Sequence, residues 1–213
     1  MVVEMTEFEK MRKGMLYESA DFDLTKIRSN AHNLCQKYNK VKETSEKKRN
    51  KIINKLIPNK KEGVYLQGPI YFDYGLNTTL GLNFYANFNF TVLDCATVTI
   101  GDNVFIGPNV SLMTPVHPFL PSERNIFTKE DGMVTDVEYA KPIKIGNDCW
   151  LASNVVVLGG VSIGDGCIIG AGSVVTKDIE ANSLAYGNPC RVVRKITEAD
   201  SVYLKKELFI EEL

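Results

Sequence analysis

The chain has 213 residues, enough for one domain with a sizeable core or for one domain with a small appendage. Its 25 Lys and Arg residues balance its 26 Asp and Glu residues, which argues against a field that would attract nucleic acid or an anionic membrane. The sequence also lacks an apolar stretch of about 18 residues and a secretory signal at MVVEMTEFEKMRKG, so we expect a cytoplasmic protein that binds neither nucleic acid nor membrane.

Residues 1–60 are expected to form an N-terminal helical segment. The stretch KIRSNAHNLCQKYNKV carries apolar side chains three and four residues apart, at Ile27, Ala31, Leu34 and Tyr38. This spacing is typical of a helix with one apolar face. A similar stretch, SEKKRNKIINKLI, is stopped by Pro58. Asp21 precedes the first stretch and is more typical of a helix N-cap than of a functional site.

The next region, about 61–192, repeats every six residues. Apolar residues return at each sixth position with one exception, in the series Val64, Ile70, Leu76, Leu82, Phe88, Asp94, Ile100, Ile106 and Leu112. A second run extends from Ile145 to Val175. Helices and ordinary strands have side-chain periods near 3.6 and 2, so neither explains the repeat. The pattern predicts short strands joined by sharp corners, with three hexapeptides in each triangular coil and the aliphatic side chains buried between stacked coils.

The two runs are out of phase, because the distance from Leu112 to Ile145 is not a multiple of six. The segment between them, HPFLPSERNIFTKEDGMVTDVEYAKP, is polar and contains prolines, so we expect a loop outside the solenoid at about 117–142. Long loops in compact domains are usually functional or disordered. After the repeat, residues 193–213 predict a short C-terminal helix, with Thr197 and Asp200 in a capping arrangement.

The two histidines differ in their surroundings. His32 lies on a predicted helix and is interpreted as a surface residue. His117 stands where the repeat stops and the loop begins. Histidine has an unperturbed pKa of about 6.5, which suits proton abstraction near neutrality. A loop histidine held by local turn contacts is the alternative, and the residues alone do not choose between them. The five cysteines form no CxxC pair and no metal-ligand spacing, which indicates reduced thiols and no metal.

Several motifs occur in a fixed order along nearly the whole chain: GMLYESAD, DYG, NFYANFN, LDCATVTIGDN, HP, KPIKIGNDCW, GAGSVVTKDI and GNPCRVVRKI. In order and spacing they resemble the maltose and galactoside O-acetyltransferases, which are hexapeptide-repeat acyltransferases. The resemblance implies a mainly β fold, a left-handed parallel β-helix. The handedness comes from the resemblance, since right-handed crossovers are otherwise the rule. It also implies acetyl-CoA as co-substrate and a homotrimer with active sites between subunits.

The resemblance implies roles for individual residues. His117 would take the proton from an acceptor hydroxyl as that oxygen attacks the thioester, in a direct transfer without an acyl-enzyme. Asn87 matches a residue of the acceptor pocket. Asp94 is a second candidate there, because a carboxylate at an inward-facing position is costly to bury without hydrogen bonds. A distorted corner with Asp94 turned to water is the alternative.

The resemblance also implies a cofactor cleft, lined by Trp150, Ser153, Ala171, Thr176, Lys177, Arg191 and Arg194. The three cations suit the nucleotide phosphates. Each of these residues could instead be a solvated coil edge, and Trp150 could be packing alone.

Three other functions compete with this interpretation. A γ-type carbonic anhydrase needs three histidines around zinc, and the chain has two. A structural solenoid without turnover would keep the repeat. Within the enzymes, the acceptor could be an amine, an antibiotic or an amino-acid hydroxyl instead of a sugar. The segment from His117 to Trp150 is longer than in the bacterial sugar enzymes, which leaves the acceptor preference open.

Overall fold

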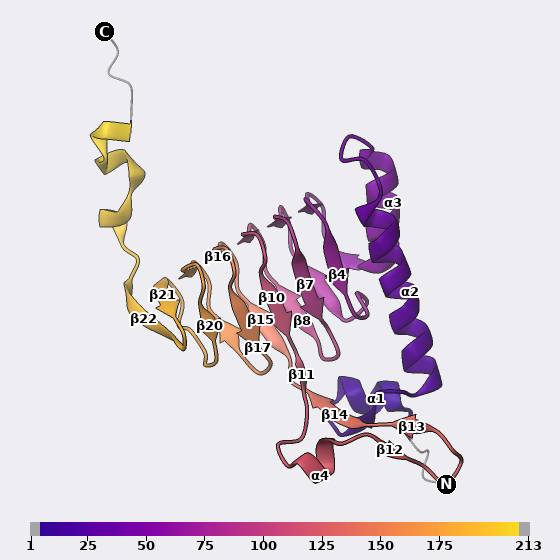
Figure 1. Ribbon diagram of the computed structural model, residues 1–213. Helices are drawn as coiled ribbons and strands as arrows, with labels where there is room; N and C mark the ends of the chain where they lie inside the picture. The colour runs from indigo at the N-terminus through magenta and orange to yellow at the C-terminus, as the bar shows by residue number, and fades with distance from the viewer. Residues whose placement is uncertain (1–4, 209–213) are drawn as a thin grey trace.

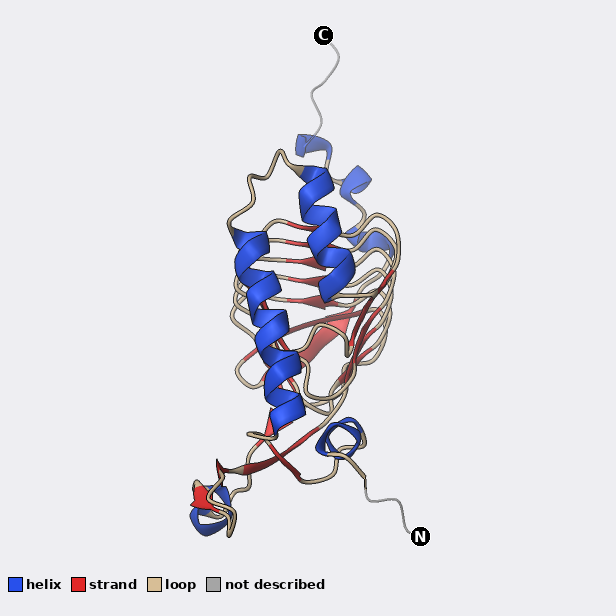
Figure 2. Cartoon of the chain, turned by 90° about the vertical axis from the view of Figure 1, so that its right-hand side faces the viewer, coloured by secondary structure: helices blue, strands red, loops and turns tan. Residues whose placement is uncertain are grey.

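The computed structural model describes residues 5–208, which form a parallel β-solenoid with helices at its N-terminal end (Figure 1). The N-terminal elements are α1 (Glu7–Arg12), β1 (Tyr17–Glu18), α2 (Phe22–Asn39) and α3 (Glu46–Leu56). Helices α2 and α3 lie across the open end of the first coil (Figure 2). They cover apolar side chains that the end of a solenoid would otherwise expose. Asp21 caps α2, as predicted, by accepting hydrogen bonds from the backbone N–H groups of Asp23 and Leu24.

The coils stack through three parallel sheets, which we call faces. The first face contains β3 (Tyr65–Leu66), β6 (Tyr85–Ala86), β9 (Phe105–Ile106), β16 (Trp150–Leu151), β19 (Ile168–Ile169) and β21 (Ser183–Gly187). The second face contains β4 (Ile70–Phe72), β7 (Phe90–Leu93), β10 (Ser111–Met113), β17 (Val156–Leu158) and β20 (Val174–Val175). The third face contains β2 (Asn59–Lys60), β5 (Thr78–Leu80), β8 (Val98–Ile100), β15 (Ile143–Ile145) and β18 (Ser162–Ile163). Strand β22 (Cys190–Lys195) pairs antiparallel with β21 at the C-terminal end of the first face.

The coils before the loop are longer than three hexapeptides. Tyr65 pairs with Tyr85, 20 residues ahead, whereas Trp150 pairs with Ile168, 18 residues ahead. The additional residues lie between the second and third faces, at a bend that we call the second corner. The first corner joins the first and second faces, and the third corner joins the third and first. The six-residue series therefore leaves the core register, and two of its members, Leu82 and Phe88, are exposed.

The first and third corners are narrow and carry ladders of polar side chains. At the third corner Asn83 Nδ2 donates to Asn103 Oδ1, and Asn103 Nδ2 donates to Asp148 Oδ1, both at 3.0 Å. All three residues have a positive φ, between 54° and 56°, which Asn and Asp adopt more readily than other residues with a Cβ. A second ladder runs through the first corner, along Asn89, Asn109 and Asn154.

The interior of the solenoid is one continuous apolar core. It includes residues from all three faces and continues into α2 and α3 through Ala31, Tyr38, Ile53 and Leu56. The five cysteines are all free and buried. In the part of the chain that the structure describes, no helix has the length and apolar character needed to cross a membrane.

The predicted C-terminal helix is present only as short turns. Strand β22 occupies the chain as far as Lys195, and three 3-10 turns follow, at Glu198–Asp200, Val202–Leu204 and Lys206–Leu208. None of these turns buries a residue, so no packing stabilises a longer helix. Thr197 N does donate to Asp200 Oδ2 at 3.0 Å, as the capping pattern predicts. The end of the predicted helix, residues 209–213, lies outside the described residues.

Candidate active site

The chain leaves the stack at the second corner after β10 and returns at β15. The excursion contains β11 (Pro115–Val116), α4 (Pro121–Arg124), β12 (Phe127–Thr128), β13 (Val134–Thr135) and β14 (Val137–Ala140). Its far part lies away from the coils (Figure 1). Strand β14 pairs antiparallel with β11 on one side and with the N-terminal strand β1 on the other. Gly159 of the next coil lies directly against Thr114. A Cβ at this glycine would lie only 2.6 Å from the Thr114 carbonyl oxygen, so the two backbones can approach only without a side chain here. Three segments distant in sequence therefore meet at this corner.

His117 follows β11 directly, and its side chain is 51% exposed. Its Nδ1 lies 3.7 Å from Asp136 Oδ2, and its Nε2 lies 3.6 Å from Glu138 Oε2. Both distances exceed those of good hydrogen bonds, so neither nitrogen is fixed to one carboxylate. The ring can thus donate to one carboxylate while its other nitrogen accepts a proton, which is the arrangement that a general base needs.

Both carboxylates are held from behind by hydroxyls of the N-terminal segment. The Tyr17 hydroxyl donates to Glu138 Oε1, and the Ser19 hydroxyl donates to Asp136 Oδ1. Burial raises the pKa of Glu138, while the hydrogen bond from Tyr17 and the charge of His117 act in the opposite direction. Sequence reasoning missed all four residues. One signal for the acids was present, since alternate residues of a strand share a side and TDVEYA carries acids two residues apart.

The structure corrects the expectation that Asp94 faces an acceptor. Its Oδ1 accepts hydrogen bonds from the backbone N–H groups of Tyr74, at 2.8 Å, and Gly75, at 3.1 Å. Its Oδ2 accepts one from the Thr78 hydroxyl at 2.9 Å, and the residue is fully buried. Burial raises the pKa of Asp94, which these three donors oppose. Asp94 is therefore a structural carboxylate that binds the backbone of the preceding, widened corner.

The other predicted site residues divide between two edges of the second face. Asn87, Ser153 and Ala171 lie at the first corner, each in the turn after a strand of the first face, and Trp150 lies on that face itself. Thr176 and Lys177 follow β20 and lie at the second corner, the edge that also carries His117. One chain therefore does not bring Asn87 and His117 together.

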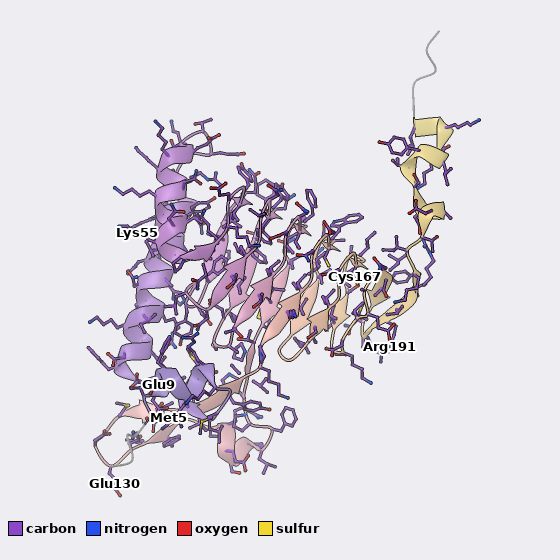
Figure 3. The ribbon with its side chains drawn as sticks, turned by 180° about the vertical axis from the view of Figure 1, so that it is seen from behind. Met5, Glu9, Lys55, Glu130, Cys167 and Arg191 are labelled. Atoms are coloured by element: carbon purple, nitrogen blue, oxygen red, sulfur yellow. The ribbon has the colours of Figure 1, made fainter. Side chains whose placement is uncertain are left out.

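The two predicted arginines lie on β22, and Figure 3 shows Arg191 at the C-terminal end of the stack. Arg194 forms two hydrogen bonds with the Asp200 carboxylate, at 2.7 and 2.6 Å, and this contact raises the pKa of Arg194. Arg191 donates from Nη1 to the Cys190 carbonyl at 2.8 Å. The charge of Arg194 is thus partly neutralised within the chain, whereas Arg191 has no acidic partner among the hydrogen bonds and ion pairs described for residues 5–208.

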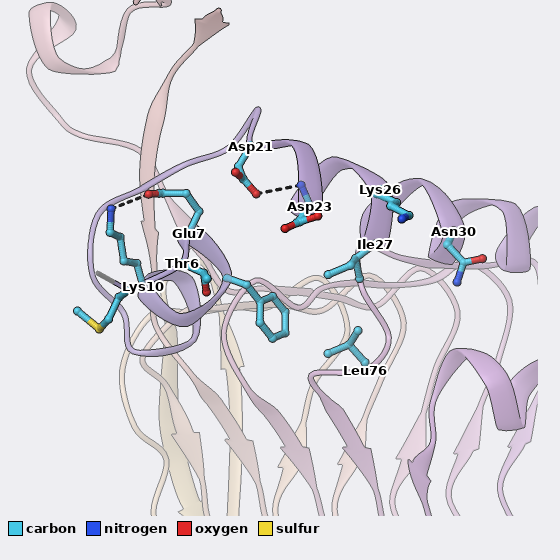
Figure 4. Close-up of a pocket in the computed structure, with 11 residues that line it drawn as sticks. Thr6, Glu7, Lys10, Asp21, Asp23, Lys26, Ile27, Asn30 and Leu76 are labelled. Atoms are coloured by element: carbon cyan, nitrogen blue, oxygen red, sulfur yellow. Dashed lines mark hydrogen bonds and ion pairs between the residues drawn. The ribbon is translucent and has the colours of Figure 1, made fainter. Parts of the chain in front are cut away.

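A separate groove of about 960 Å³ lies between α1 and the start of α2 (Figure 4). Apolar side chains at its base, such as Ile27 and Leu76, lie below a charged rim. Two of the rim acids already bind within the fold, because Glu7 pairs with Lys10 and Asp21 caps α2. None of the predicted site residues lines this groove, and we assign it no function. Within residues 5–208 no cluster of three His, Cys, Asp or Glu side chains is arranged to hold a metal ion.

Comparison with known families and proteins agrees with the motifs. Residues 10–60 match the maltose acetyltransferase hexapeptide capping motif, residues 142–177 match the bacterial transferase hexapeptide, and residues 97–117 match the hexapeptide repeat of succinyl-transferase. Galactoside O-acetyltransferase from Escherichia coli (strain K12) is 40% identical over 209 residues, which cover 98% of both chains. The chain belongs to the maltose and galactoside O-acetyltransferase family.

Solved structures place this family member among the hexapeptide-repeat acetyltransferases. A maltose O-acetyltransferase from Clostridium difficile 630 is 41% identical, with a TM-score of 0.83 over 91% of this chain and 99% of that chain. A galactoside acetyltransferase in complex with coenzyme A is also 41% identical, with a TM-score of 0.84 over 92% of this chain and 94% of that chain. The capping-motif match covers α2 and α3, the helices that close the first coil, and also β1, which reaches the candidate active site.

Proposed function

We propose that this enzyme transfers the acetyl group of acetyl-CoA directly to a hydroxyl of a sugar or related small molecule, with His117 as general base. Membership of the family and the coenzyme A complex of a relative support the donor. The observation that carries the base assignment is the half-exposed imidazole of His117 between two carboxylates, each held by a hydroxyl from another segment.

The reaction follows from this arrangement. The acceptor oxygen attacks the thioester carbonyl carbon, and the imidazole takes the hydroxyl proton as the new C–O bond forms. The imidazolium is stabilised by the carboxylates beside it. The C–S bond then breaks, and the leaving CoA sulfur takes the proton. No acyl-enzyme is needed, and the five buried thiols offer no accessible nucleophile. Free thiols also support a reducing cytoplasm as the place of action.

We further propose that the active site is completed between copies in a homotrimer. His117 and Asn87 lie at opposite edges of the second face, so a neighbouring copy has to supply one of them. The first face offers a surface for this contact, because it carries a ladder of aromatic rings, of which Tyr65, Phe105 and Trp150 are exposed. The rings of Tyr65 and Tyr85 stack at 6.0 Å, and those of Tyr85 and Phe105 lie 6.1 Å apart, with Trp150 next in register. An apolar surface of this kind is typical of an interface.

The same arrangement divides the cofactor between two copies. Thr176 and Lys177 lie on the edge that carries His117. Ser153 and Ala171 lie on the edge that a second copy would present, and Trp150 lies on the first face beside that edge. Lys177 and Arg191 suit the nucleotide phosphates, since cations bind phosphate directly. Arg194 contributes less, because Asp200 already neutralises part of its charge.

Release of free CoA tests the reaction. Acetyl-CoA is supplied with a panel of sugars, simple alcohols and amines, and His117→Ala is compared with His32→Ala as the matched control. His32 is half-exposed and contacts Asp73, outside the cluster around His117. We expect His117→Ala to lower kcat by about 10²- to 10⁴-fold and His32→Ala to leave it unchanged. Transfer is refuted if no acceptor raises CoA release above background, and a fully active His117→Ala refutes the base.

A further inference from the structure

Tyr17 lies one hundred residues before His117 in the sequence. In the fold it is separated from His117 by a single side chain, that of Glu138. Strand β1 pairs with β14 so that Tyr17 is directly opposite Glu138, and cross-strand partners present their side chains on the same side. The Tyr17 ring is buried, at 1% exposure, in a small apolar cluster with Met11, Leu24 and Ala140. This cluster is separate from the core of the solenoid, and it fixes where the Tyr17 hydroxyl points.

The two oxygens of Glu138 have different partners. Oε1 accepts the hydrogen bond from Tyr17, whereas Oε2 lies 3.6 Å from His117 Nε2. The Glu138 side chain is only 11% exposed, so its orientation depends on these protein partners. One carboxylate therefore connects a buried phenol to the half-exposed imidazole.

The charge on Glu138 depends on several neighbours. Burial raises its pKa most, and the charge of Asp136 raises it further, while the Tyr17 hydrogen bond, His117 and Arg28 lower it. Arg28 itself donates to the Ser19 carbonyl and the Tyr74 hydroxyl, both at 3.2 Å. Tyr17 remains a donor throughout the working range, because burial and the neighbouring Cys95 and Glu138 raise its pKa far above the ordinary value. The Tyr17 hydroxyl is thus the largest of the influences that favour the ionised form of Glu138.

We propose that Tyr17 is a positioning residue for the acetyl transfer, which acts by holding Glu138 ionised and oriented toward His117. This inference rests on the proposed function of His117 as base. Tyr17 contacts neither substrate nor the reacting atoms; it acts through Glu138. The N-terminal segment thereby serves the chemistry as well as closing the first coil, since β1 supplies this hydroxyl.

The first test is Tyr17→Phe, which keeps the ring and removes the hydroxyl. We expect kcat to fall about 10-fold, the loss typical of a hydrogen bond to a charged group, with an unchanged KM for acetyl-CoA. Without the hydroxyl, Glu138 protonates more readily, and a neutral Glu138 no longer stabilises the imidazolium. The acid limb of the kcat/KM profile should therefore move to lower pH, by about half a pH unit or more. Glu138→Gln removes the charge outright and should move it in the same direction.

The matched control is Tyr38→Phe. Tyr38 is also buried, and its hydroxyl donates to the Leu66 carbonyl and accepts from Arg49, far from His117 in the fold. We expect this variant to lose stability and keep the wild-type pH profile.

When Tyr17→Phe is introduced into the Glu138→Gln variant, kcat should fall by less than about 2-fold. The effects of two substitutions are not additive when both act through the same contact. Replacement of Tyr17 by 3-fluorotyrosine, a stronger donor of the same shape, should move the acid limb to higher pH, which keeps the test available if Tyr17→Phe does not fold.

Three results would overturn the positioning role while leaving the base intact. In the first, Tyr17→Phe has wild-type kcat and a wild-type pH profile although His117→Ala is inactive. In the second, Tyr17→Phe lowers kcat as much in the Glu138→Gln background as in the wild type. In the third, Tyr38→Phe shifts the pH profile as much as Tyr17→Phe does. Full activity of His117→Ala would instead reject the proposed function, so the two failures are distinguishable.

Discussion

The third corner and the second corner of the solenoid are built from the same repeat but differ in length and in role. The third corner is narrow, with few residues between its two faces, whereas the second corner is wide. At the third corner equivalent residues of successive coils bond to one another, as Asn83, Asn103 and Asp148 do. At the second corner two additional residues enter each early coil, and after β10 the whole loop enters at the same place. Regular corners hold the frame, whereas the corner that breaks the repeat carries His117, the proposed base, and the two carboxylates beside it.

At the second corner, one polar side chain of a coil binds backbone groups of the coil before it. Asp94 of one coil binds the backbone of Tyr74 and Gly75 in the coil before. Thr114 of the next coil donates from its hydroxyl to the Leu93 carbonyl and accepts from Ala96 N. Each wide corner is thus held by one polar residue of the coil that follows. The position from which the loop and His117 leave depends on these few contacts.

The largest effect on stability is expected for Asp94→Ala. The substitution leaves two buried backbone N–H groups and the Thr78 hydroxyl without their acceptor, which should lower the free energy of unfolding by about 4 kcal/mol. Asp94→Asn keeps one carbonyl oxygen and should lose roughly half as much. Urea unfolding measures both. If Asp94→Ala lost as little as a surface substitution, the wide corner would not depend on this carboxylate.

Much of the frame could be predicted from the sequence, because an aliphatic side chain returning every six residues leaves few alternatives. The true register could not, since apolar residues also stand at the six-residue positions after the additional residues and hide the shift. Leu82 and Phe88 continued the pattern and are nevertheless exposed. The place of His117 at the end of the repeat makes it a candidate base, and the family resemblance adds the proposed role. Its partner Glu138 depends on a pairing with Tyr17, 121 residues away, which no local pattern reveals.

A smaller effect is expected for Asn103→Ala at the narrow corner. Ala is strained at a φ of 55°, and two ladder hydrogen bonds are lost, so the free energy of unfolding should fall by about 2 kcal/mol. Asn103→Gly removes the same hydrogen bonds without the backbone strain and should cost roughly 1 kcal/mol. Activity per folded molecule should stay at the wild-type value in both variants. A loss of kcat in Asn103→Gly would show that the narrow corners also serve the chemistry.

The smallest effect concerns the two arginines of β22. We expect Arg191→Ala to raise the KM for acetyl-CoA about 5- to 10-fold, as the loss of one charge-assisted phosphate contact would. Arg194→Ala should raise it less than about 3-fold, because Asp200 already binds both guanidinium nitrogens. Initial rates at varied acetyl-CoA give both values. Equal effects would mean that Arg194 leaves Asp200 when the cofactor binds.

The central claim is that the wide corner of one copy supplies the base to a site that a second copy completes. It is tested most directly by mixing two inactive variants, His117→Ala and Asn87→Ala, under conditions that exchange subunits. In an equimolar mixed trimer about a quarter of the sites would join an intact second corner to an intact first corner, as closed cyclic symmetry requires. The account predicts recovery of about that fraction of wild-type kcat. A mixture of exchanged subunits that remains as inactive as its parents would contradict it.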